Sequence, residues 1–266
     1  MLRNIFLKTL RDRFRGLVFW GVGLLFLSFY LIAFYPVIAG SPELSSFLDN
    51  LPPAARSLLG DIPDMLSPAG YFQAEMFTLS GPILFLIYTI LFGSDTIAGE
   101  EQRGTLELLL ANPVSRTRTV LEKLGALVVA TGILALVLWD GLALGSALYD
   151  IDLSPGKLAG ATLALFLLAV SFGALALALG CWTGRKSLAA GTAGVVAVAS
   201  YFLNTTASFN ESLAPYRKLS LFYHYGGNDP LRNGLDWGGA GLLLGVTLIL
   251  ALIAVLGLNR RDIGVN

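Results

Sequence analysis

The sequence predicts an all-α, polytopic membrane protein with six transmembrane helices and both termini in the cytosol. Three observations carry this prediction: an apolar composition, six long uncharged runs, and an uneven distribution of lysine and arginine between them. Apolar residues make up 55% of the 266 residues and charged residues only 14%. A soluble chain carries about 25% charged residues. Too few polar side chains are therefore present to cover a water-exposed surface.

The six uncharged runs are each long enough to cross a bilayer as a helix, which takes about 20 residues. The second run is short and the third contains Asp140, an acid well inside an otherwise apolar stretch. We expect the spans at about residues 17–38, 74–94, 124–149, 158–182, 188–207 and 238–258.

The segment before the first span, residues 2–15, is amphipathic at helical spacing. Cations and one acid occupy one face, and apolar residues and a threonine occupy the other: Leu2, Ile5, Phe6, Thr9, Leu10 and Phe14. Such a pattern is typical of a helix that lies in the membrane interface with its cations among anionic head groups. We therefore predict a separate elbow helix over residues 2–15, followed by the first span.

The distribution of basic residues predicts the orientation, because cytosolic segments next to spans are enriched in lysine and arginine. With the N-terminus in the cytosol, 13 of the 18 lysines and arginines lie on the cytosolic side. This orientation places loops 40–70 and 208–236 outside and leaves residues 95–123 as a long cytosolic segment. The whole chain, residues 1–266, is then one transmembrane domain.

Several classes of function are disfavoured by residue counts. The formal net charge is +0, so no global charge favours a nucleic-acid partner. The single cysteine, Cys181, excludes an intrachain disulfide and a cysteine-cluster metal site. The single histidine, His224, stands without a second histidine or cysteine nearby, so we expect no metal site.

The cytosolic segment 95–123 predicts a short helix between two breaks. Gly104 is expected to end the preceding helix, Thr105 to cap a new helix, and Pro113 to end that new helix. Leu106, Leu109 and Leu110 share an apolar face, and Ser115 is expected to cap the helix that follows. Two interpretations fit: a helix that inserts into a groove on a cytosolic partner, or a connection that only anchors the ends of two spans.

The same segment carries a motif that resembles a known family. It reads Gly99-Glu100-Glu101, then Gly104-Thr105-Leu106-Glu107, then Leu109-Leu110 and Pro113-Val114-Ser115-Arg116, with Lys123 a few residues on. This motif is similar to the signature of ABC-2 type ABC-transporter permeases. The ending Asn259-Arg260-Arg261-Asp262-Ile263 resembles that family's ending after its last span, and the resemblance covers the whole chain.

The resemblance implies a permease that works with partners. It implies a nucleotide-binding subunit that hydrolyses ATP, a second permease chain that is either an identical copy or a paralogue, and surrounding membrane lipid in a prokaryotic plasma membrane. It also implies export of a drug-like, antibiotic or lipidic substrate. The residues that the resemblance assigns to coupling with the ATPase are Glu100, Glu101, Gly104, Thr105, Leu106, Glu107, Leu109, Leu110, Pro113, Val114, Ser115 and Arg116.

A phosphate-binding loop requires a glycine, four residues, and then Gly-Lys-Ser or Gly-Lys-Thr. The nearest string, from Gly180 to Ser187, has the wrong spacing and lies at the end of an apolar run. We therefore expect that this chain is not an enzyme and binds no cofactor, and that ATP and magnesium belong to the partner subunit.

Polar residues within the spans are candidates for a substrate pathway. In the resembling family, spans two and five face each other across the dimer axis and border the path. The candidates on these spans are Thr78, Tyr88, Thr89, Tyr201, Asn204 and Thr205. The alternative is that their hydroxyls bond to their own helix, as most intramembrane serines and threonines do.

Asp140 leaves two alternatives open. An ionisable group inside a span is a functional candidate by default, so Asp140 is a candidate for the substrate pathway or for a proton relay. A proton relay would make the protein a proton-coupled secondary transporter. The other alternative is a role at the outer interface or in helix pairing.

Overall fold

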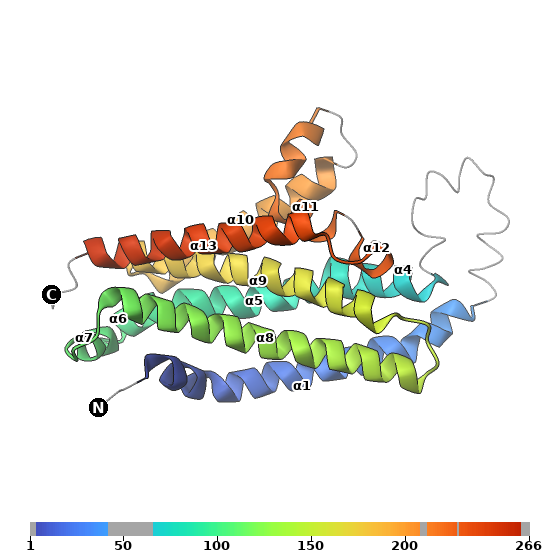
Figure 1. Ribbon diagram of the computed structural model, residues 1–266, viewed down its shortest axis with the longest axis horizontal. Coiled ribbons are helices and arrows are strands. Elements are labelled where there is room, and N and C mark those ends of the chain that lie inside the picture. Colours follow the sequence, from blue (N-terminus) through green and yellow to red (C-terminus); the bar gives the residue numbers. More distant parts are fainter. Residues whose placement is uncertain (1–3, 42–65, 208–211, 228, 262–266) are drawn as a thin grey trace.

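The computed structural model describes residues 4–41, 66–207, 212–227 and 229–261 (Figure 1). All regular structure in these parts is helical. Six helices among the described residues are long and apolar enough to cross a membrane, which confirms the predicted all-α class and the number of spans. They are α1 (Ile5–Ala39), the helix Pro68–Gln102, α8 (Arg116–Leu148), α9 (Pro155–Thr183), α10 (Lys186–Ala207) and α13 (Trp237–Arg260).

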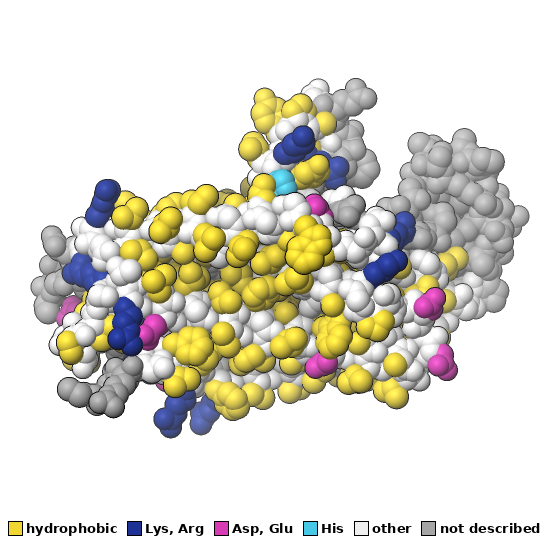
Figure 2. All heavy atoms as spheres, in the orientation of Figure 1, with side chains coloured by type: hydrophobic (Ala, Val, Ile, Leu, Met, Phe, Trp, Pro, Cys, Tyr) yellow, Lys and Arg dark blue, Asp and Glu magenta, His cyan; other side chains and the backbone are white. Residues whose placement is uncertain are grey.

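The long helices lie side by side along the long axis of the molecule (Figure 1). Apolar side chains cover the middle of the visible face, and most of its charged side chains lie toward the two ends (Figure 2). A soluble protein exposes many charged side chains over its whole surface, whereas the middle of this face exposes mainly apolar ones. Such a surface is expected for a protein in contact with the hydrocarbon core of a membrane.

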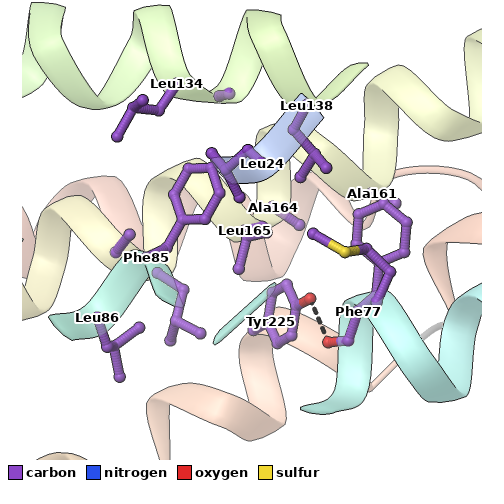
Figure 3. Close-up of a cluster of buried hydrophobic side chains, with 14 of the residues drawn as sticks. Leu24, Phe77, Phe85, Leu86, Leu134, Leu138, Ala161, Ala164, Leu165 and Tyr225 are labelled. Atoms are coloured by element: carbon purple, nitrogen blue, oxygen red, sulfur yellow. Dashed lines mark hydrogen bonds between the residues drawn. The ribbon is translucent and has the colours of Figure 1, made fainter. Parts of the chain in front are cut away.

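The centre of the bundle is α9, which packs against α5, α8, α10 and α13. Its small residues allow close approach: a Cβ added at Gly93 of α5 would lie 2.2 Å from the carbonyl oxygen of Gly173 of α9. Close contact through small residues is a common way for helices to associate in membranes. The core also contains larger side chains, among them Leu24, Phe85, Leu134, Leu138 and Leu165 (Figure 3).

The second long helix contains two π-helical segments. It consists of α4 (Pro68–Phe72), η2 (Gln73–Ser80), α5 (Gly81–Ser94), η3 (Asp95–Gly99) and α6 (Glu100–Gln102). The helix therefore continues past the end that we predicted at residue 94. Segments of π-helix inside α-helices occur frequently at functional sites, and η3 contains the first residue of the predicted cytosolic segment.

The predicted break between an elbow helix and the first span is wrong, because α1 is one continuous helix across residues 15–17. A lone glycine such as Gly16 costs a helix about 1 kcal/mol and does not by itself end it. The backbone N–H groups of Ile5 and Phe6 donate to the carboxylate of Glu122 on α8, at 2.7 and 3.1 Å. Residues 2 and 3 of the predicted elbow lie outside the described residues.

The face of this segment that we expected in lipid packs largely against protein. Ile5 and Thr9 are buried, and Phe6 and Leu10 pack partly buried against the core, whereas the side chain of Phe14 is 61% exposed. The amphipathic pattern was therefore real, but most of its apolar face is covered by the chain itself.

The opposite end of the bundle carries shorter helices. The predicted loop 208–236 contains η4 (Ala214–Leu219), α11 (Leu221–Gly226) and α12 (Pro230–Asn233), while its residues 208–211 and 228 lie outside the described part. The Tyr225 hydroxyl donates to the carbonyl oxygen of Phe77 at 2.5 Å (Figure 3), and burial raises the pKa of Tyr225. Residues 42–65 of the predicted loop 40–70 are likewise outside the described residues.

Candidate coupling segment and pathway groove

A short helix, α7 (Thr105–Leu110), lies between α6 and α8 at the end of the bundle near the chain termini (Figure 1). Gly104 separates α6 from α7 with a φ of 69°, a conformation that glycine adopts without steric cost. Thr105 is the first residue of α7 rather than its predicted cap, and its hydroxyl donates backward to the Glu100 carbonyl at 3.1 Å. The predicted cap at Ser115 is confirmed, since its Oγ accepts the N–H of Arg118 at 3.2 Å.

The apolar face of α7 is turned inward. Leu106 and Leu109 are buried in a cluster that includes Ile5 of α1, Val120 of α8 and Leu258 of α13. The predicted apolar face therefore anchors α7 to the rest of this chain and is not free to enter a groove on another protein. Sequence periodicity identified an apolar face, but it could not specify which protein covers that face.

The outward surface of α7 has a different composition. The side chain of Leu108 is 72% exposed, and Glu107, Thr105 and Gly104 are also exposed. One large apolar side chain beside a carboxylate is thus presented at this end of the bundle.

The two adjacent glutamates of the motif form ion pairs within the chain. Glu100 lies 2.7 Å from the ammonium of Lys123, whose side chain is fully buried and also donates to the Thr96 carbonyl at 2.6 Å. Glu101 forms a two-point ion pair with Arg261 at 2.5 and 3.0 Å. These contacts connect the segment to α8 and to the residue that follows α13.

Arg116 and its neighbours connect the other side of the segment. The Arg116 guanidinium donates to the carbonyl oxygens of Leu258 and Arg261, at 3.0 and 2.5 Å. Val114 packs partly buried beside the cluster under α7, while Pro113 is exposed. The backbone after α13 is therefore held against the start of α8.

Asp95 is the residue that sequence reasoning missed. Its carboxylate, only 8% exposed, pairs with Arg13 of α1, with Arg103 at 2.9 Å and with Lys186 of α10 at 2.7 Å. It raises the pKa of Arg103. A signal was present in the sequence, because Asp95 is the first charge after an uncharged run and each neighbouring cytosolic segment contains cations.

The motif glycine Gly99 has a steric explanation in this cluster. A Cβ at this position would lie 2.2 Å from Oδ1 of Asp95, so a larger residue would displace the carboxylate. Asp95, its three cations, and the Glu100–Lys123 and Glu101–Arg261 pairs are called the charge network below. This network links α1, α8, α10 and the end of α13 to the segment that contains α7.

A groove of about 460 Å³ lies between the second long helix and α10. Its lining is almost entirely apolar, with Thr78 and Tyr201 as the two predicted pathway residues that it brings together. Further lining comes from Leu79, Pro82, Ile83, Leu86, Ile87, Ile90, Leu91, Ala190, Gly194, Ala197, Val198, Phe202 and Phe222.

Comparison with known protein families decides the identity. A family model described as ABC-2 family transporter protein matches residues 3–263. The chain belongs to the ABC-2 transporter family. No curated protein matches the sequence. Members of this family are membrane permeases, typically the membrane subunit of an ABC transporter, and they generally partner with an ABC ATPase subunit.

Two pathway candidates of this ABC-2 permease lie in its interior. Tyr88 is buried with its ring 5.8 Å from that of Trp20, and Thr89 is buried and donates to the Phe85 carbonyl of its own helix at 2.9 Å. Both therefore lie away from the groove, and Thr89 follows the alternative of bonding to its own helix.

The remaining candidates of the permease lie elsewhere. Asn204 accepts from Arg217 at 2.9 Å, and Thr205 is exposed and donates to the Tyr201 carbonyl at 3.1 Å. Asp140 is exposed on α8, on the same face as the exposed Leu136 and Leu144. Among the described residues, no group of histidine, cysteine, aspartate and glutamate side chains is arranged to hold a metal ion.

Proposed function

We propose that this chain is the permease subunit of an ATP-driven exporter in a prokaryotic plasma membrane, with both termini in the cytosol. Two permease copies work with two nucleotide-binding subunits, which bind ATP and magnesium and perform the hydrolysis. The permease itself is not an enzyme and binds no cofactor. Membership in the ABC-2 family supports the ATPase partnership, and the excess of lysine and arginine at the α7 end supports the orientation.

The observation that carries the proposal is the position of α7. It exposes Leu108 and Glu107 outward and is joined inward, through Leu106, Leu109 and the charge network, to α1, α8, α10 and α13. A partner that binds the outward surface therefore acts on a segment connected to four long helices. We infer that residues 100–116 transmit the closure of the ATPase dimer to these helices.

The groove between α5 and α10 is the proposed substrate pathway. Its apolar lining suits an apolar or amphipathic cargo of the drug, antibiotic or lipid classes. The surface of α10 beyond the groove remains uncovered, since Val195 is 69% and Val196 42% exposed. The second permease copy is proposed to face this surface, so that the two grooves lie together at the dimer axis.

The decisive test concerns the outward surface of α7. Glu100 and Glu101 hold ion pairs inside the chain, so reversing their charge also disturbs the permease fold. The double variant Glu107→Lys/Leu108→Asp changes only exposed side chains. We expect it to abolish transport and substrate-stimulated ATP hydrolysis in the reconstituted complex, with unchanged amounts of permease in the membrane.

The matched control is Asp152→Lys, a charge reversal at an exposed residue between α8 and α9, at the other end of the bundle. It should leave transport and ATP hydrolysis as in the wild type. Normal coupling of hydrolysis to transport in the α7 double variant would contradict the proposal. Asp140 is exposed on α8 and lies outside the groove, a position that does not favour the proton-coupled alternative.

A further inference from the structure

A second groove lies on a different side of the bundle, between α1 and α8. Its volume is about 930 Å³, and it shares no lining residue with the groove between α5 and α10. One end is lined by Arg11, Asp12 and Arg15, and the rest is lined by apolar side chains up to Leu25 of α1 and Val137 of α8. A charged end with two arginines and one aspartate therefore continues into an apolar groove.

Most of the lining of this groove comes from α1, and α8 contributes Ile133, Leu134 and Val137. Near its start, α1 places the Phe6 ring beside Gly125 of α8, and further on it places Gly21 beside Leu134. The groove therefore runs along α1 and meets α8 around Leu134.

The cations at the mouth of this space are available to a ligand. Arg11 and Arg15 are one helical turn apart, so they share a face, and both are exposed. Within the part of the chain that the structure describes, neither forms an ion pair, whereas Arg13, on another face of the helix, is paired with Asp95. Asp12 also lines the groove. The two arginines outnumber this one aspartate, so the mouth has a net positive charge.

The apolar part of the groove has the length of a lipid tail. From Arg15 to Leu25, α1 rises about 15 Å, which is half of the roughly 30 Å hydrocarbon core and therefore one leaflet. A phosphate group forms charge-assisted hydrogen bonds with arginine, and basic pockets between transmembrane helices bind anionic head groups. A protein helix in the groove would instead have to bury two arginines and an aspartate, which is costly.

We propose that the groove between α1 and α8 binds one anionic phospholipid, with its phosphate at Arg11 and Arg15 and one acyl chain along α1 toward Leu25. This site does not depend on the transport proposal, because it uses different helices and no residue of the α5–α10 groove.

The test measures which lipids the full permease complex retains. The complex is extracted from nanodiscs that contain equal amounts of phosphatidylglycerol and phosphatidylcholine, and its bound lipids are identified by native mass spectrometry. We expect one phosphatidylglycerol per permease chain in the wild type. A basic residue near an anionic lipid contributes roughly fivefold in affinity, so Arg11→Gln/Arg15→Gln should lower retention by at least about tenfold. The control Arg260→Gln, an exposed arginine outside the groove, should leave retention unchanged.

A second pair of variants tests the apolar part. Gly21 lines the groove, whereas Gly23 does not and has open space around its added Cβ. Gly21→Leu should displace the lipid, while Gly23→Leu should retain it. Glycerol phosphate without acyl chains should not compete, because the apolar part of the groove supplies part of the affinity.

Four outcomes would overturn the assignment. The first is equal retention of the two lipids by the wild type, and the second is unchanged retention in both the arginine and the Gly21 variants. The third is disulfide cross-linking of two permease chains through Val22→Cys, a residue that lines the groove, because the occupant would then be a second copy. Full competition by glycerol phosphate would show a free-anion site in place of a lipid site.

Discussion

The α7 end of the bundle and the α5–α10 groove differ in the kind of side-chain interaction that they contain. The α7 end holds its parts together with buried and half-buried ion pairs, whereas the groove is lined by aliphatic and aromatic side chains with two hydroxyls. Ion pairs and hydrogen bonds fix distances and directions, while apolar surfaces accept many shapes. The comparison teaches that fixed side-chain geometry is found at the α7 end, where a partner protein is expected to bind. The groove, where a cargo is expected to bind, can accept ligands of different shapes.

The largest effect should come from removing the carboxylate at the centre of the charge network. Asp95→Ala leaves Arg13, Arg103 and Lys186 without their shared partner. Breaking a buried pair costs about 3–5 kcal/mol, and because these cations are 33–53% exposed, we expect about 2–3 kcal/mol. Thermal unfolding of the purified complex measures this loss, and transport should be lost with it.

Asp152→Ala is the control for that change, since it removes an exposed carboxylate at the opposite end of the bundle. An equal loss of stability in the two variants would show that Asp95 has no special role, and the contrast between the two regions would fail.

The next effect concerns a single pair within the network. Lys123→Met removes a fully buried ammonium and leaves Glu100 without its cation, so we expect a loss of about 2 kcal/mol in the free energy of unfolding. Glu100→Leu should be similarly destabilising, because it leaves the ammonium unpaired. The double variant should be more stable than the sum of the two losses predicts, by about 1 kcal/mol or more. Strict additivity in this cycle would mean that the pair contributes nothing.

A smaller effect on stability, but a clear effect on transport, is expected in the groove. Gly194 of α10 lines the groove and Gly241 of α13 does not, and an added Cβ meets nothing within 4 Å at either position. Gly194→Phe should fill the groove and reduce transport several-fold, with unfolding temperatures within about 3 °C of the wild type, as for a surface change. Gly241→Phe should transport normally. Normal transport by Gly194→Phe would contradict this assignment of the pathway.

The smallest effect is expected at Asp140, which belongs to neither region. Because its side chain is exposed on α8, Asp140→Asn should change the free energy of unfolding by less than about 0.5 kcal/mol and leave ATP-driven transport intact. Flux measured in proteoliposomes with a proton gradient and no ATP provides the check. A gradient-driven flux that disappears in this variant would instead support the proton-coupled transporter.

The helices were predictable because uncharged length and apolar composition are properties of a continuous stretch of sequence. The Ser115 cap was predictable for the same reason, since its partner lies three residues away. The charge network was not, because Asp95 meets cations that lie as much as 91 positions away in the sequence at Lys186. The inward orientation of α7 also depends on distant residues, Ile5 and Leu258 among them.

The error at the elbow has a similar origin. The amphipathic pattern of residues 2–15 fits a membrane interface and a protein surface equally well, because both present an apolar side and a polar side. Glu122 on α8 binds the first N–H groups of α1 and holds the segment against the bundle, and no local signal near residue 5 indicates that carboxylate. Of the pathway residues, only Thr78 and Tyr201 meet in the groove, because polarity alone does not indicate which side of a helix faces its neighbour.

The contact between Gly93 and Gly173 has a mechanical consequence. With the two backbones this close, no side chain separates α5 from α9 at this point, and sliding α5 by one helical turn would bring a larger residue of the same face, such as Thr89, against the facing backbone. The two helices are therefore expected to move together without sliding past each other. With α5 and α9 fixed in this way, we expect the proposed pathway groove to widen and narrow through movement of α10.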